Sequence, residues 1–121
     1  MIARDELGAL FGGLRAVLTV ADEDGCIIFL NDLAQQYYAD RGGEALVGTH
    51  LDDCHDPASQ DKIKQHYARY RAGDLTPTRY REEEGDGRAE CILLLPLIVS
   101  GQFRGVAELM WTERPELVLE L

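Results

Sequence analysis

Hydrophobic residues near the start of the chain recur with the spacing of a helix. The stripe consists of Leu7, Leu10, Phe11 and Leu14. Glycines interspersed with these residues weaken such a helix by up to about 1 kcal/mol each relative to alanine. We therefore expect a marginal amphipathic helix within residues 1–15. It needs a packing partner, either the rest of the chain or a second copy.

Two short runs rich in strand-forming residues follow, at 16–21 and 26–30. The residues between them end in Asp24-Gly25, and Asp-Gly between apolar runs predicts a tight hairpin because the turn requires a positive φ. Asn31 or Asp32 then offers an N-cap for a short helix that ends by Ala39. Residues 44–47 predict one further helical turn.

The clearest helix signal begins at Asp56, a residue type that caps helix N-termini. Pro57 suits the first helical position, where its missing N–H would have no partner in any case. Ile63 and Tyr67 lie on one apolar face, and Gly73 has the residue type that commonly follows a helix end. The residues between Asp56 and Gly73 are predicted to form the longest helix.

Three further strands are predicted after this helix, at 76–83, 89–99 and 103–111, with glycine-containing turns between them. The chain thus runs through two strands, short helices, one longer helix and three strands. Helices grouped between two sets of strands indicate the α+β class, with helices over one face of an antiparallel sheet of about five strands.

The charge balance argues against a nucleic-acid partner. The chain has 12 basic and 22 acidic residues, which gives a net charge of -10 over 121 residues. A phosphate backbone must be met by clustered lysine and arginine, and the basic residues here are spread among acids. Acidity of this size favours solubility and identifies no partner.

Cysteine use and the longest apolar run indicate a cytoplasmic location. Cys26, Cys54 and Cys91 are odd in number and widely spaced, which fits neither a disulfide framework nor a C-x-x-C metal site. The apolar run 91–99 is about half as long as a membrane helix requires and contains Pro96. Neither a signal peptide nor a membrane span is expected.

The order of elements and several short motifs resemble the PAS family. The matching stretches are 20–31 (VADEDGCIIFLN), 46–48 (LVG) and 105–113 (GVAELMWTE), the last resembling the closing strand and a degraded form of the family's D-I-T-E ending. The resemblance covers residues 16–113 and implies a PAS domain there. It would follow the N-terminal helix of residues 1–15 and precede a tail of residues 114–121.

A sharper likeness lies in residues 47–59 (VGTHLDDCHDPAS). It is similar to a bacterial PAS subgroup that carries V-G-x5-C-H-P-P-x-S before its long helix. Asp56 stands here in place of the first proline, which preserves the helix start and adds a capping oxygen.

The resemblance implies a sensory or signalling domain of a bacterial regulatory pathway, which binds a small molecule or relays a signal through dimerisation to a downstream regulatory protein. A ligand-free dimerisation or docking module is the alternative. A redox or metal sensor that uses Cys54 and His55 is a more distant alternative. The same two residues are also expected in a structural role, as a buried thiol beside a histidine that is hydrogen-bonded to the backbone. No motif of a hydrolase, kinase or metalloprotease occurs, so no enzymatic activity is expected.

A ligand would lie between the long helix and apolar side chains of the sheet. The candidate ligand-binding residues are Ile28, Leu30, Cys54, His55, Ile63, His66, Tyr67 and Leu93. Tyr37, Tyr38, Tyr67 and Tyr70 could also line such a pocket, although aromatic residues at helical spacing mostly belong to a core.

No cofactor or metal ion is expected. Oxygen-sensing PAS domains ligate haem from the long helix, and aligning their similar R-Y-R ending on residues 69–71 places the ligand at Ile63 instead of His66. The reactive cysteine of flavin-binding light sensors would fall at Leu51.

The chain is expected to form a homodimer, because closed symmetric dimers are the commonest oligomers. The candidate interface consists of Leu7, Leu10, Phe11 and Leu14.

Overall fold

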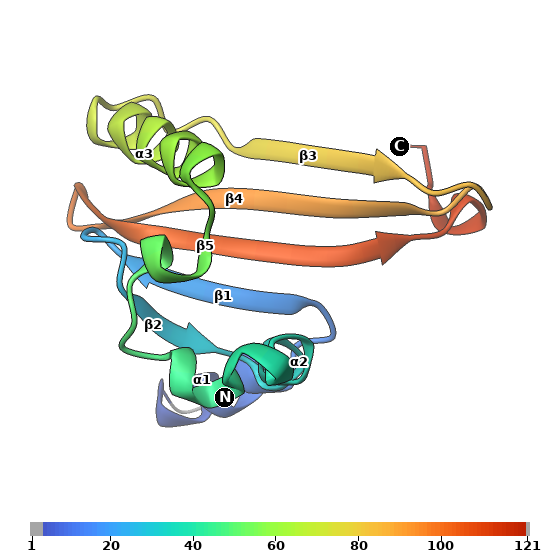
Figure 1. The fold of residues 1–121 in the computed structure, drawn as a ribbon, viewed down its shortest axis with the longest axis horizontal. Helices are drawn as coiled ribbons and strands as arrows, with labels where there is room; N and C mark the ends of the chain where they lie inside the picture. Colours follow the sequence, from blue (N-terminus) through green and yellow to red (C-terminus); the bar gives the residue numbers. More distant parts are fainter. Residues whose placement is uncertain (1–3, 121) are drawn as a thin grey trace.

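The computed structural model describes residues 4–120 and contains five strands, three α-helices and four short 3-10 helices (Figure 1). The strands are β1 (Val17–Asp22), β2 (Ile27–Leu30), β3 (Thr78–Glu83), β4 (Ala89–Val99) and β5 (Gln102–Glu113). The α-helices are α1 (Arg4–Gly12), α2 (Asp32–Tyr37) and α3 (Pro57–Arg71). The 3-10 helices are η1 (Ala39–Arg41), η2 (Gly43–Leu46), η3 (Leu51–Cys54) and η4 (Pro115–Leu117).

The strands form one antiparallel sheet in the order β2-β1-β5-β4-β3. The helices between β2 and β3 lie over one face of this sheet, so the expected α+β class is confirmed (Figure 1). The last strand, β5, occupies the centre of the sheet between β1 and β4. It therefore joins the hairpin of β1 and β2 to β4 and β3.

The hairpin between β1 and β2 has the tight turn that Asp24-Gly25 predicts. Gly25 has a φ of +86° and donates its N–H to the Asp22 carbonyl at 3.0 Å. A side chain at this position would also collide with His50, whose ring lies 2.8 Å from the place of a Cβ. Glycine is therefore required here by conformation and by space.

Helix α3 begins and ends at the predicted signals. The Asp56 side chain accepts a hydrogen bond from the Ser59 N–H at 2.8 Å, and Pro57 occupies the first turn. Gly73 follows the C-cap residue with a φ of +96°. The backbone hydrogen bond from Ser59 holds the pKa of Asp56 below its ordinary value, as expected for a capping carboxylate.

Asn31 is completely buried and ties the start of β1 to α2. Its side-chain oxygen accepts from the Leu18 N–H at 3.0 Å and from the Ala34 N–H at 2.9 Å. Its amide nitrogen donates to the Leu14 carbonyl at 3.1 Å and to the Ala16 carbonyl at 2.7 Å. One side chain thus caps α2 and holds the chain segment that leads into β1.

The face of the sheet turned away from the helices keeps apolar side chains partly exposed. We call this surface the outer face and define it by Val20, Leu93, Leu95, Leu109 and Trp111, which alternate along their strands with residues of the helix-bearing face. Trp111 is 36% exposed. The stripe on α1 is exposed as well, with Leu10 at 53% and Phe11 at 52%. The described part of the chain therefore leaves apolar side chains partly exposed on both surfaces.

The two longest strands, β4 and β5, pair from Ala89 with Glu113 to Val99 with Gln102. Strand β3 pairs with β4 only as far as Leu94. Pro96 therefore lies where β4 has β5 on one side and no strand on the other. This is a position where a sheet tolerates a residue without an N–H.

Candidate functional site

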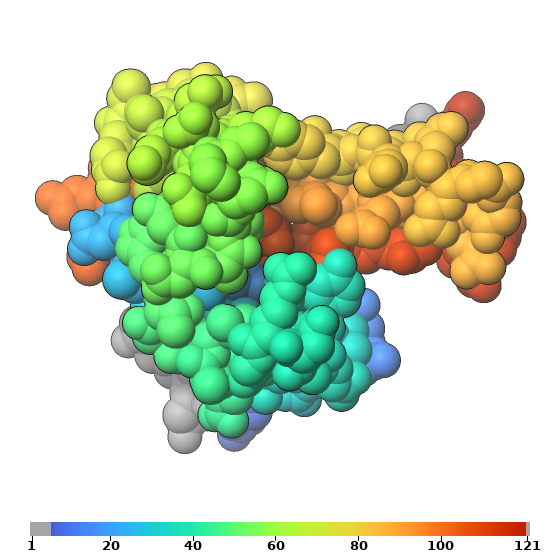
Figure 2. All heavy atoms as spheres, in the orientation of Figure 1, coloured from blue at the N-terminus to red at the C-terminus, as the bar shows by residue number. Residues whose placement is uncertain are grey.

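A cavity of about 500 Å³ lies between the helix-bearing face of the sheet and the segments α2, η3 and α3. In the space-filling view, a hollow between α2 (teal) and α3 (green) leaves the orange and red strands visible at its base (Figure 2). The strands contribute alternate residues to its floor, among them Ile92 and Leu94 of β4 and Val106 and Met110 of β5.

The structure brings six of the eight predicted ligand-binding residues to this cavity. They are Leu30, Cys54, His55, Ile63, His66 and Tyr67. Ile63 and Tyr67 reach it from α3, Cys54 from the end of η3 and Leu30 from the end of β2. The expected position between the long helix and the sheet is therefore where the cavity lies.

The structure does not bring Ile28 and Leu93 to this cavity. Ile28 is 53% exposed, and neither residue lines the cavity. Side chains alternate between faces along a strand, so Leu93 lies on the outer face when Ile92 and Leu94 face the cavity. In the first hairpin an irregularity between Val20 and Ala21 shifts the register by one residue, which turns Ile27 toward the cavity in place of Ile28.

Tyr67 supplies a ring to the cavity wall, and its hydroxyl is already engaged. The hydroxyl donates to the Asp22 carbonyl at 2.9 Å, and the ring meets Phe103 edge-on with centroids 5.6 Å apart. Burial, with a smaller contribution from the Asp22 carboxylate, raises the pKa of Tyr67. Tyr67 therefore remains neutral and fixes α3 to the turn between β1 and β2.

His66 stands at the edge of the cavity and connects α3 to β3. Its Nε2 lies 2.6 Å from the Tyr80 hydroxyl. Burial, and then the charge of Arg69, lower the pKa of His66 below its ordinary value. The His66 ring is therefore neutral, and its contact with Tyr80 links α3 to β3.

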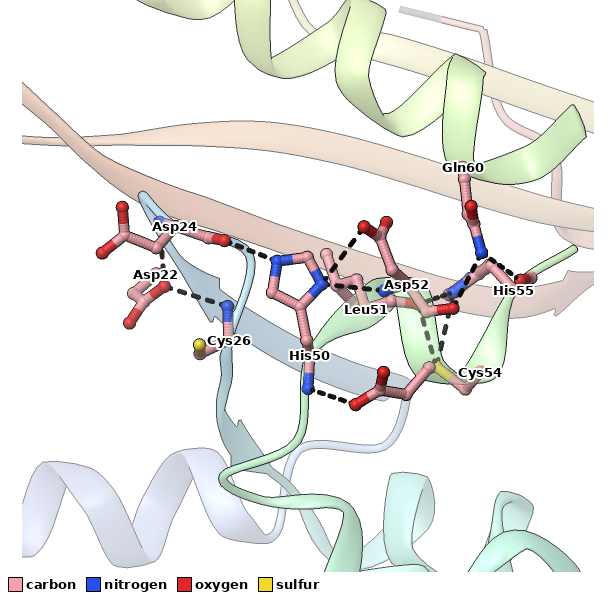
Figure 3. A network of polar contacts seen from close by, with 10 residues as sticks. Asp22, Asp24, Cys26, His50, Leu51, Asp52, Cys54, His55 and Gln60 are labelled. Carbon is pink, nitrogen blue, oxygen red and sulfur yellow. Dashed lines mark hydrogen bonds and ion pairs between the residues drawn. The ribbon is translucent and has the colours of Figure 1, made fainter. Parts of the chain in front are cut away.

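A polar network holds Cys54 and His55 at the cavity (Figure 3). His50 begins it, because its Nε2 lies 2.7 Å from the Asp24 carbonyl and its Nδ1 accepts from the Asp52 N–H at 3.0 Å. The 3-10 helix η3 follows His50 directly in the chain and was not predicted from the sequence. The side chain of Gln60 closes the network by donating to the carbonyls of Asp52 and His55, both at 2.9 Å.

The geometry of Cys54 and His55 does not favour an activated thiol. The His55 Nδ1 lies 2.6 Å from the Leu51 carbonyl, so it carries a proton and donates it there. The Cys54 Sγ lies 3.4 Å from that Nδ1 and donates to the same carbonyl, also at 3.4 Å. Burial raises the pKa of the Cys54 thiol, whereas a reactive cysteine needs a lowered one.

A polar cluster formed by Thr19, Tyr38 and Glu108 also lines the cavity, and of these only Tyr38 was expected from the sequence to line a pocket. Burial raises the pKa of the Glu108 carboxyl, which His55 offsets in part. Burial, and then the nearby Glu108 carboxylate, raise the pKa of Tyr38 to about 12. A signal for this cluster exists in the sequence, since Thr19 interrupts the apolar run 17–21 and Glu108 interrupts the apolar run 105–111.

The described residues contain no group of three or more histidine, cysteine or acidic side chains placed to hold a metal ion. Within the same part of the chain, no helix is both long and apolar enough to span a membrane.

No protein-family model matches the chain, and no curated protein sequence matches it significantly. Solved structures do match. A C-terminal domain from Streptococcus mutans aligns with a TM-score of 0.73 and 19% identity, over 90% of this chain and 84% of that one. The PAS domain of BvgS from Bordetella pertussis aligns with a TM-score of 0.62 and 22% identity, over 93% and 89%. A sensory box sensor histidine kinase from Vibrio cholerae gives 0.60 and 18%, over 90% of each chain. At these identities the likeness establishes a common fold, and the chain has the PAS fold.

Proposed function

We propose that this PAS-fold chain is a sensory domain of a bacterial regulatory pathway, which binds a small molecule in the cavity beneath α3. The observation that carries the proposal is the cavity itself. Its volume of about 500 Å³ falls within the range of natural ligand pockets, roughly 300–1,000 Å³. Its walls combine apolar side chains with a few convergent polar groups, which is the usual composition of such pockets.

In this proposal the domain senses and relays without catalysing a reaction. Its likeness to the PAS domain of BvgS and to a sensory box sensor histidine kinase supports a signalling role that passes to a downstream regulatory protein in the cytoplasm. The motif of residues 47–59 would serve to place Cys54 and His55 at the cavity. A ligand-free docking module would have no need of an open cavity.

The cavity can be filled by Ile63→Trp, because Ile63 faces it from α3. Native mass spectrometry of protein purified from its own host should show a bound small molecule on the wild-type chain. We expect the added indole to occupy the same space and to abolish the adduct. Ile28→Trp introduces the same side chain at an exposed position outside the cavity and should leave the adduct unchanged. An adduct that persists in Ile63→Trp would place the ligand elsewhere.

We further propose that the chain forms a homodimer through α1. Two observations support it: the exposed stripe of Leu7, Leu10, Phe11 and Leu14, and the partly exposed apolar side chains of the outer face. Contiguous apolar patches beyond a few hundred Å² are rare on soluble monomers. In a dimer, α1 of one copy would cover the outer face of its mate.

Sedimentation at micromolar concentration tests the dimer. Leu10→Asp combined with Phe11→Asp places two charges on the α1 stripe and should give a monomer. The matched control is Val118→Asp with Leu119→Asp, which alters two exposed apolar residues of the tail and should leave the dimer intact. A monomeric wild-type chain would refute the proposal, and a dimer that survives the α1 changes would place the interface elsewhere.

A further inference from the structure

Three oxygen-bearing side chains converge on one wall of the cavity from three different segments. Thr19 of β1 and Glu108 of β5 are register partners on adjacent strands, so their side chains lie side by side on the cavity face. Tyr38 follows α2 and approaches the same place, since both Glu108 and the Thr19 hydroxyl act on its pKa. We call this group the oxygen cluster.

The oxygen cluster lacks the partners that buried polar groups normally have. The Thr19 hydroxyl oxygen is buried and has no hydrogen-bond partner among the described residues, and Thr19 as a whole is 8% exposed. Tyr38 is near enough for the Thr19 hydroxyl to lower its pKa slightly, yet the two hydroxyls do not reach hydrogen-bonding geometry. Nor does Glu108 receive a hydrogen bond from the part of the chain that the structure describes; only burial and the charge of His55 act on its carboxyl. Leaving the buried Thr19 hydroxyl unpaired costs free energy, which a bound hydrogen-bonding group would recover.

The chemistry of the cluster selects the kind of group that can satisfy it. A carboxylate only accepts hydrogen bonds, and both hydroxyls can accept as well. The basic side chains that line the cavity, Arg41 and Lys62, belong to η1 and α3 and not to the sheet. A ligand carboxylate would therefore meet Glu108 with like charge, whereas a cation would be attracted by it and by the net charge of -10.

We infer that the cavity binds a primary amine with a compact apolar body. This inference rests on the proposed function and specifies its ligand class. An ammonium group has three N–H donors, one each for the Glu108 carboxylate, the Thr19 hydroxyl and the Tyr38 hydroxyl. The apolar body lies against Leu30, Ile63, Val106 and Met110, which line the same cavity.

Three probes with the same six-carbon chain test the inference: n-hexylamine, 1-hexanol and sodium hexanoate. Saturation-transfer NMR titrations of the full chain at pH 7 and 150 mM salt measure the affinity of each probe. The salt is present because it screens the attraction of a charged probe to exposed surface charge. We expect hexylammonium to bind at least about tenfold more tightly than hexanoate, with hexanol between them, a difference of about 1.4 kcal/mol or more.

Two isosteric variants identify the oxygen cluster as the binding group. Glu108→Gln and Thr19→Val should each weaken hexylammonium binding and leave hexanol binding nearly unchanged, with the larger loss, about tenfold, in Glu108→Gln. Glu82→Gln removes the same charge from an exposed position of β3 outside the cavity and should bind hexylammonium as the wild type does. Circular dichroism and thermal melts establish that each variant is folded.

The outcomes separate this inference from the proposed function. Hexanoate binding as tightly as hexylammonium, or full affinity in Glu108→Gln, overturns the amine assignment. If Ile63→Trp still abolishes binding of the probes in that case, the cavity remains a ligand site of another chemistry. Binding of none of the three probes also overturns the inference, and the native mass spectrum then decides separately whether the cavity carries a different ligand.

Discussion

Replacing Asn31 with alanine is expected to lower the free energy of unfolding by about 4 kcal/mol, since four hydrogen bonds are lost at about 1 kcal/mol each. The side chain is completely buried, and alanine leaves the backbone groups that it satisfied without a partner. Small domains have a total stability of roughly 5–15 kcal/mol, so this loss is a large fraction of it. Urea denaturation followed by circular dichroism measures the change.

Two further variants separate the network from a general effect of truncation. Asn31→Asp keeps the oxygen that accepts from Leu18 and Ala34 but replaces the amide donor with a charged acceptor that faces two carbonyl oxygens. It should also be strongly destabilised at neutral pH. Gln35→Ala removes one hydrogen bond, to the Leu30 carbonyl, and should cost about 1 kcal/mol. A loss below about 1 kcal/mol in Asn31→Ala would show that water replaces the side chain.

The second large effect is expected at Gly105, where β5 passes β1. A Cβ at this position would lie 2.3 Å from the Ala21 carbonyl oxygen and 3.2 Å from the Asp22 Cα. Both are backbone atoms of β1, which cannot move away without disturbing the ladder between β1 and β5. We expect Gly105→Ala to destabilise the chain by about 3 kcal/mol, at the upper end of the cost of overpacking.

The matched control for this substitution is Gly85→Ala, in the turn between β3 and β4. A Cβ at Gly85 has no atom within 4 Å, and the position has no positive φ. Its free energy of unfolding should therefore stay within about 0.5 kcal/mol of the wild type. Equal stability of the two variants in urea would mean that β1 and β5 separate at little cost.

The parts of the fold that were predictable from the sequence are those whose signals are local. Gly25 and Gly73 have the positive φ that their residue type indicates, and Asp56 caps α3 as its position before Pro57 suggests. Each of these positions needs only its neighbours in the chain to specify its geometry. The order of strands and helices was predicted from local signals of the same kind. The α+β class was predicted from that order.

The features that were not predictable depend on residues far apart in the chain. The turn η3 follows a histidine that contacts a carbonyl 26 positions away, a contact that no local pattern encodes. Ile28 lies outside the cavity because of the shifted register between Val20 and Ala21, since one displaced residue exchanges the two faces of a strand. Glu108 is a charge within the apolar run 105–111, but its place in the cavity depends on which face of the sheet the helices cover.

Pro96 has a consequence for how copies of the chain can and cannot assemble. Beyond Leu94, β4 is bordered by a strand only on the β5 side, and an unpaired strand edge is where other chains add and aggregation begins. A proline offers no N–H to an incoming strand and interrupts the ladder that such growth requires. The chain can therefore present the apolar outer face to a second copy. Along the stretch of β4 at Pro96 it does not also offer a continuous strand edge from which a fibril could grow.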